Sequence, residues 1–184
     1  MWNKAELSAD QRALLNKNIL DLSGEVNEAM TAYATNAILS LISRGTVPEL
    51  EIRLSTPGGN AEESLRIYDL LRTYPAKTTA RVLGGAHSAG ATILQACTKR
   101  MCGRYSTLHI HLPMLNWTKI KRFDLSRQRI EKEREELRQL EKQLCAILTS
   151  RNDLSLQKIR KIMKDNDPLS APQAKRFGLI DEIF

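Results

Sequence analysis

The stretch LEIRLSTPGGNAEESLRIYDLL, Leu50–Leu71, predicts a strand, a turn and a helix in succession. Its first six residues form the predicted β-strand, and Pro57–Gly59 break that strand at a tight turn. The residues after the turn predict a helix in which Leu65, Tyr68 and Leu71 face inward. The stretch therefore indicates one strand-turn-helix unit of an α/β protein.

The same order of elements occurs on both sides of this unit. Asn18–Leu22 (NILDL) predicts a strand, and the residues after Gly24 predict a helix. Downstream, Thr78–Leu83 (TTARVL) predicts a third strand, followed by two glycines and a helix of small residues over about 88–96. Because strands alternate with helices, we expect an α/β fold with parallel strand pairing. The inward positions of the helix after Gly24 are Val26, Met30, Tyr33, Ala37 and Leu41.

A long helix is predicted over about residues 123–150. Apolar residues recur there at every seventh position, and a second apolar stripe, Leu140 and Ile147, begins only in the later half. The first half has too narrow an apolar face to be buried on both sides, so we expect this handle helix to project from the body. A partner normally covers such a face, which suggests self-association. The residues at every seventh position are Phe123, Ile130, Leu137 and Leu144.

The composition of the 184-residue chain, 42% hydrophobic and 27% charged, is that of a globular protein and excludes wholesale disorder. We expect a short N-terminal segment, 1–17, and a single domain, 18–184. The N-terminus has no apolar run of the kind found in signal peptides or membrane spans, which predicts a cytoplasmic protein.

The net charge of +7 is concentrated around the long helix. Charges of both signs alternate there and aromatic residues are scarce, so a solvated helix face is expected rather than a nucleic-acid or membrane partner. Cys97, Cys102 and Cys145 form an odd set without CxxC spacing, which predicts buried free thiols and neither a disulfide framework nor a zinc site.

Three short segments contain residues that could take part in catalysis or ligand binding: STPGGN at 55–60, GGAHSAGA at 84–91 and HIHLP at 109–113. Each has an ordinary interpretation. The first segment can be a plain turn, and the serine of the second can be a helix N-cap. The third can be two histidines on one strand face with no third metal ligand nearby. Together they supply what a nucleophilic serine requires: a base within reach and backbone N–H groups that can hold an oxyanion.

These segments, with LSAPQAKRFGLIDEI near the C-terminus, resemble the proteolytic subunit of the Clp protease (ClpP), over about residues 18–184. The resemblance implies a crotonase-like α/β fold and a serine endopeptidase that hydrolyses unfolded proteins or short peptides without a metal or organic cofactor. It implies Ser88 as nucleophile, His111 as base, and the amides of Gly59 and Ala89 as oxyanion hole.

The position of the family's triad acid is occupied by Asn166, which we expect to replace the aspartate as partner of His111. A local shift that brings in Asp165 or Asp167 is the alternative. His109 corresponds to an apolar position of the family, and we expect it to be a hydrogen-bonded histidine in the wall of the site. His87 has no assigned role.

The resemblance further implies an oligomer of two stacked heptameric rings, a tetradecamer, joined through the long helix. A Clp ATPase unfoldase is a possible partner, although the segment before Asn18 is shorter than in the family. One alternative is a weakly active or inactive ring subunit that supports an active paralogue. A second is an acyl-CoA enzyme of the crotonase type, which the serine and histidine in peptidase register argue against.

Overall fold

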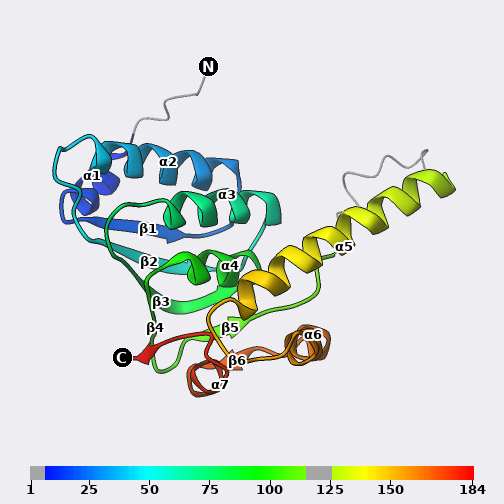
Figure 1. The fold of residues 1–184 in the computed structure, drawn as a ribbon. Helices are drawn as coiled ribbons and strands as arrows, with labels where there is room; N and C mark the ends of the chain where they lie inside the picture. Colours follow the sequence, from blue (N-terminus) through cyan, green and yellow to red (C-terminus); the bar gives the residue numbers. More distant parts are fainter. Residues whose placement is uncertain (1–6, 115–125) are drawn as a thin grey trace.

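The computed structural model describes residues 7–114 and 126–184 and places them in a mixed α/β fold (Figure 1). Parallel strands lie in the order β1-β2-β3-β4-β7, β5 pairs with the second half of β3, and β6 runs antiparallel to β5. The strands are β1 (Ile19–Ser23), β2 (Leu50–Thr56), β3 (Thr78–His87), β4 (Lys99–Cys102), β5 (Thr107–His109), β6 (Leu169–Ser170) and β7 (Glu182–Ile183).

The helices follow the strands as the strand-turn-helix pattern predicts. Helices α2, α3 and α4 pack beside one another along the sheet, α1 packs on β1, and α6 packs on the long helix α5 (Figure 1). Their bounds are α1 (Ala9–Leu15), α2 (Glu28–Ile42), α3 (Ala61–Arg72), α4 (Ala89–Ala96), α5 (Arg127–Thr149), α6 (Leu156–Asp165) and α7 (Ala171–Arg176).

The hydrophobic core lies between the sheet and this helix layer. Strand β2 alternates buried and half-buried residues along its length, and the inward positions predicted for α2 are all buried. In α3 the prediction is confirmed for Leu71 but wrong for Leu65 and Tyr68, which are half-buried. The buried face of α3 is rotated toward Ser64 and Ile67, because it must contact both α2 and α4.

Strand β3 is longer than predicted, and its two halves pair with different strands. Thr79–Val82 pair with β4, whereas Gly85–His87 pair with β5. The change of partner coincides with an irregularity in the pairing of β3 with β2, and Gly84 has a φ of 83° there. Because glycine adopts such a φ without steric cost, the strand continues through the two glycines to His87.

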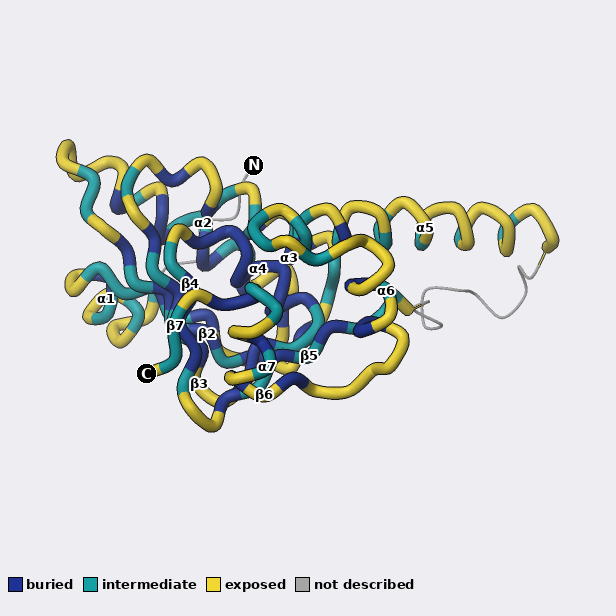
Figure 2. The backbone as a smooth tube through the Cα atoms, turned by 60° about the horizontal axis from the view of Figure 1, so that its bottom comes forward, coloured by how far each residue is buried: buried dark blue, intermediate teal, exposed yellow. Residues whose placement is uncertain are grey.

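Helix α5 projects from the body, as its narrow apolar stripe predicted (Figures 1 and 2). Its buried residues, Cys145 and Leu148, lie near its C-terminal end, while Ile130 is 45% exposed. The helix begins at Arg127, and the predicted Phe123 lies outside the described residues. Arg129 and Glu133, one turn apart on its surface, form an ion pair at 2.8 Å.

Strand β7 is held to the body by a buried arginine. Arg100 is 2% exposed and contacts the Asp181 carboxylate at 2.5 Å through its guanidinium, and its backbone N–H donates to the same group at 2.7 Å. Arg151 adds a second cation 3.6 Å from Asp181. The three cysteines are free and buried.

Within the described ranges, no helix combines the length and the apolar content that a bilayer crossing requires.

Candidate active site

Ser88 lies at the junction of β3 and α4, in a backbone conformation that is costly for serine. Its φ and ψ are 51° and −116°, outside the regions that L-residues favour. Its N–H donates to the carbonyl of His109 at 2.6 Å, and its carbonyl accepts from Ala91 N–H at 3.0 Å. The hydroxyl makes no capping hydrogen bond, so the ordinary interpretation of Ser88 as an N-cap does not explain this residue.

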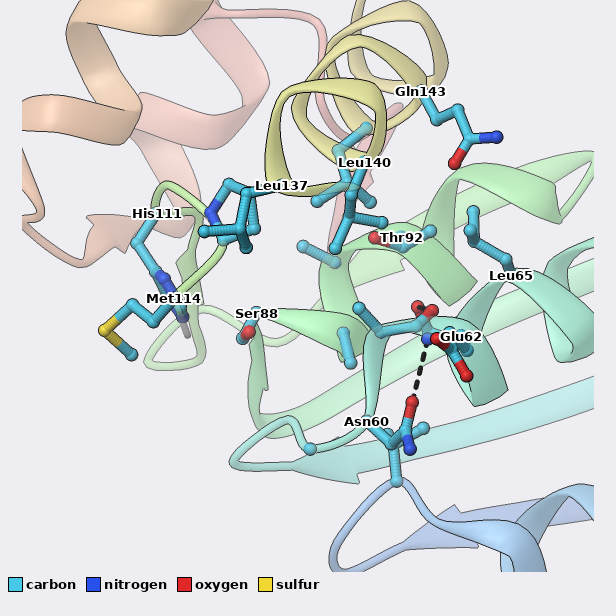
Figure 3. A pocket seen from close by; sticks show the side chains of 18 of the residues that line it. Asn60, Glu62, Leu65, Ser88, Thr92, His111, Met114, Leu137, Leu140 and Gln143 are labelled. Carbon is cyan, nitrogen blue, oxygen red and sulfur yellow. Dashed lines mark hydrogen bonds between the residues drawn. The ribbon is translucent and has the colours of Figure 1, made fainter. Parts of the chain in front are cut away.

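Glycines allow the turn after β2 to approach Ser88 closely. A Cβ on Gly58 would lie 2.7 Å from the Ser88 Cβ, and a Cβ on Gly90 would lie 2.3 Å from a methyl carbon of Thr56. Neither distance is tolerated between real side chains, so the turn and α4 could not approach this closely with larger residues. The turn then ends where Asn60 caps α3, accepting a hydrogen bond from Glu62 N–H at 2.8 Å (Figure 3).

Gly59 and Ala89, the residues expected to supply the oxyanion N–H groups, line the same pocket as Ser88. Gly59 has a φ of 147°, and its neighbours are anchored on Val26, whose N–H donates to Gly58 and whose carbonyl accepts from Asn60. Ala89 is the first residue of α4, where an N–H has no partner within the helix. Among the described residues, neither N–H donates to a backbone carbonyl in the turns, loops or helix caps.

Ser88, His111, Gly59 and Ala89 all line one open cavity of about 1070 Å³. Leu140 extends from α5 toward this cavity, and Leu65 and Thr92 approach it from α3 and α4 (Figure 3). Apolar side chains from α3 and α5 therefore form part of the cavity wall. Its apolar lining includes Leu65, Ile110, Leu137, Leu140 and Leu144.

His111 is half-buried and oriented by its own backbone. Its Nδ1 lies 2.7 Å from the carbonyl oxygen of Leu112. A carbonyl oxygen can only accept, so Nδ1 carries the hydrogen and Nε2 of the neutral ring keeps a lone pair. Among the described residues no hydrogen bond joins Ser88 to His111, although both face the cavity.

Asn166 does not contact His111 as expected, but His109. Asn166 follows α6 in the left-handed conformation, φ 57° and ψ 28°, which suits asparagine at a helix C-terminus. Its side-chain Oδ1 lies 3.0 Å from His109 Nε2, and its backbone oxygen lies 3.1 Å from the same nitrogen. Of the alternatives, Asp165 pairs with Lys161 at 3.2 Å, and Asp167 is exposed.

The three histidines of the chain form a row. His87 and His109 are directly paired across β3 and β5, with ring centroids 6.0 Å apart, and the His109 and His111 centroids are 5.3 Å apart. His87 contacts the hydroxyl of Thr107 at 2.9 Å. Burial, and then the charge of His109, lower the pKa of His87. Sequence reasoning missed this row, because the pairing of β3 with β5 is a long-range contact.

The described residues contain no group of three or more His, Cys, Asp or Glu side chains arranged to hold a metal ion.

The parallel sheet, the strained serine and the projecting helix define a protein of the ClpP/crotonase-like fold. The structure resembles a mutant of ClpP1 from Listeria monocytogenes with a TM-score of 0.83 at 22% identity, covering 95% of each chain. The chain belongs to the Clp protease family, which it matches over residues 3–184.

Two relatives are both called "ATP-dependent Clp protease proteolytic subunit 3". The protein from Synechococcus sp. is 31% identical over 173 residues, which cover 91% of this chain and 82% of that protein. The protein from Parasynechococcus marenigrum has the same identity and coverage. Family membership implies serine peptidase chemistry.

Proposed function

We propose that this chain is a serine endopeptidase subunit that cleaves unfolded proteins or short peptides, with Ser88 as nucleophile and His111 as base. The observation that carries this proposal is the strained backbone of Ser88, which leaves its hydroxyl free of a capping role and facing the cavity. Strain of this kind persists where a function requires a particular side-chain direction.

In the proposed reaction, the Ser88 oxygen attacks the peptide carbonyl while His111 Nε2 accepts its proton. His111 then returns that proton to the leaving amine, and water completes hydrolysis of the acyl-enzyme by the same exchange. The N–H groups of Gly59 and Ala89 hold the oxyanion, a contribution of about 3 kcal/mol for each donor. The Leu112 carbonyl keeps the hydrogen on His111 Nδ1, which is the tautomer that general-base catalysis requires.

We further propose that the subunit acts within stacked heptameric rings joined through α5. The apolar stripe of this projecting helix supports that assembly: Ile130 is 45% exposed and Leu137 is only half-buried, and a second copy would cover them. A Clp ATPase unfoldase is the partner that family membership suggests for delivering unfolded chains.

A fluorophosphonate probe tests the nucleophile directly. Intact-mass measurement should detect one covalent adduct per wild-type chain and none in Ser88→Ala. Ser106→Ala is a matched control, because Ser106 is buried and its hydroxyl hydrogen-bonds to the backbone of β3, at Gly84 N–H and the Val82 carbonyl. Labelling that persists in Ser88→Ala would remove Ser88 from the mechanism.

A second candidate is a weakly active or inactive ring subunit that supports an active paralogue. It is favoured by Asn166, which carries no negative charge and contacts His109 instead of His111. An aspartate replaced by asparagine can lower the turnover of a serine triad by about 10⁴-fold. If the charge is what the site lacks, Asn166→Asp should raise peptide hydrolysis, whereas Asp165→Asn should leave it unchanged because Asp165 pairs with Lys161.

A further inference from the structure

The contact between His109 and Asn166 has a defined proton arrangement. His109 Nε2 lies within 3.1 Å of two oxygens of the same residue, the side-chain Oδ1 and the backbone carbonyl. The backbone carbonyl can only accept, so Nε2 must donate, and one hydrogen is shared between the two oxygens. The amide of Asn166 is thereby oriented with its oxygen toward His109.

His109 also lies between Asn166 and the proposed base. Its ring is 5.3 Å from that of His111, centroid to centroid, and both rings are adjacent to the end of β5. The backbone of Asn166 is held by α6, whose last hydrogen bond runs from Asn166 N–H to Ile162 at 3.2 Å. A change of hydrogen-bond partner by Asn166 therefore has to occur through rotation of its side chain.

His111 makes its own local contact, through Nδ1, with the backbone carbonyl of Leu112. Leu112 is the next residue in the chain, so the hydrogen bond at 2.7 Å draws the ring toward the main chain of its own segment. In this arrangement the described residues contain no hydrogen bond from His111 to Ser88.

We propose that His109 is a positioning residue that withholds Asn166 from His111 and so keeps the site in a resting arrangement. The proposal rests on the proposed peptidase function of Ser88 and His111. When the His109 contact breaks, Asn166 Oδ1 accepts from His111 Nδ1 in place of Leu112. The ring is then oriented toward Ser88, and no bond other than these hydrogen bonds changes.

Kinetics of four variants test this competition. His109→Leu removes the donor, and it should raise kcat about fivefold with KM unchanged, the effect of one ordinary hydrogen bond on a rate. His109→Gln is the matched control, because its side-chain amide can still donate from a similar position, and its kcat should remain that of the wild type.

Asn166→Gly removes the side chain while keeping a residue that tolerates a φ of 57°. Its kcat should not exceed that of the wild type, and the double variant His109→Leu with Asn166→Gly should lose the gain of His109→Leu. A gain that persists in the double variant, or no gain in a His109→Leu protein whose Ser88 is labelled by the fluorophosphonate, overturns the proposal.

A crystal structure of His109→Leu gives a readout that is independent of activity. Asn166 Oδ1 should lie within hydrogen-bond distance of His111 Nδ1, and Leu112 should no longer be its acceptor. An Asn166 side chain that stays away from His111 in that structure overturns the proposal. If no variant is labelled or hydrolyses peptides, the proposed function fails, and the crystal structure alone still decides whether His109 controls Asn166.

Discussion

Three residues other than glycine have a positive φ in the described ranges: Asn18, Ser88 and Asn166. Asparagine tolerates the left-handed region because its short amide can hydrogen-bond locally, so Asn18 and Asn166 need no special explanation. Ser88 has neither that advantage nor a left-handed ψ. The surrounding β3-α4 junction maintains this conformation, and the free-energy cost of its unfavourable φ and ψ is consistent with a functional serine.

At the same scale, Gly59→Ala is predicted to damage the oxyanion site. The new Cβ would lie 2.3 Å from the Val26 carbonyl oxygen, so the Gly59 amide must move. Peptide hydrolysis should fall by about 10²–10³-fold, the effect of losing one oxyanion donor. Kinetics with a fluorogenic peptide measure this loss.

Gly45→Ala is the matched control for that prediction. Gly45 also has a positive φ, 83°, but nothing lies within 4 Å of its ideal Cβ. The variant should lose only about 1 kcal/mol of stability to backbone strain and should hydrolyse peptides at the wild-type rate. Equal hydrolysis by the two variants would contradict the role given to Gly59.

At the scale of elements, α5 differs from the other helices in having most of its length outside the core. Its ion pairs, such as Arg129–Glu133 at 2.8 Å, add only a few tenths of a kcal/mol each on an exposed surface. The helix therefore depends on its buried C-terminal end, where Cys145 and Leu148 pack on the body, and on whatever covers its apolar stripe.

Acidic substitution of that stripe should weaken assembly. We expect wild-type particles many times heavier than the 20.8 kDa subunit by light scattering. Ile130→Glu should shift them to smaller species, because it buries a carboxylate at the proposed contact. Gln128→Glu introduces the same charge at an exposed position on the opposite helix face and should leave the mass unchanged. A monomeric wild type would refute assembly through α5.

At the scale of the whole molecule, the contact of Arg100 with Asp181 fastens the C-terminal strand β7 to its neighbour β4 at one end of the sheet. Burial alone would raise the pKa of Asp181. Hydrogen bonds from the Arg100 side chain and backbone, with the charges of Arg100 and Arg151, outweigh burial and lower it.

The lowered pKa of Asp181 predicts sensitivity to acid. An aspartate whose pKa is lower in the folded chain stabilises the fold fully above its unfolded pKa of about 3.9, and this contribution is lost as pH falls through the folded value. Thermal unfolding measured from neutral to acidic pH should show a smaller loss of Tm for Asp181→Asn than for wild type. The control Asp69→Asn, at an exposed position of α3, should retain the wild-type pH dependence.

Much of this architecture follows from local sequence. Strand-turn-helix units are visible because apolar periodicity and Gly-Gly turns act over a few residues, and the position of Ser88 between β3 and α4 follows from them. The projection of α5 follows from the width of its apolar stripe. Local periodicity was less reliable in α3, where contacts with two neighbouring helices determine which face is buried.

Only the tertiary structure determined which groups meet in the candidate site. The division of β3 between β4 and β5 brings His87 beside His109, and the end of α6 brings Asn166 to the same ring. These contacts join residues 22 and 57 positions apart, a separation at which sequence spacing says nothing about distance. The hydrogen bond of His111 to Leu112, by contrast, is local, because Leu112 is the next residue in the chain.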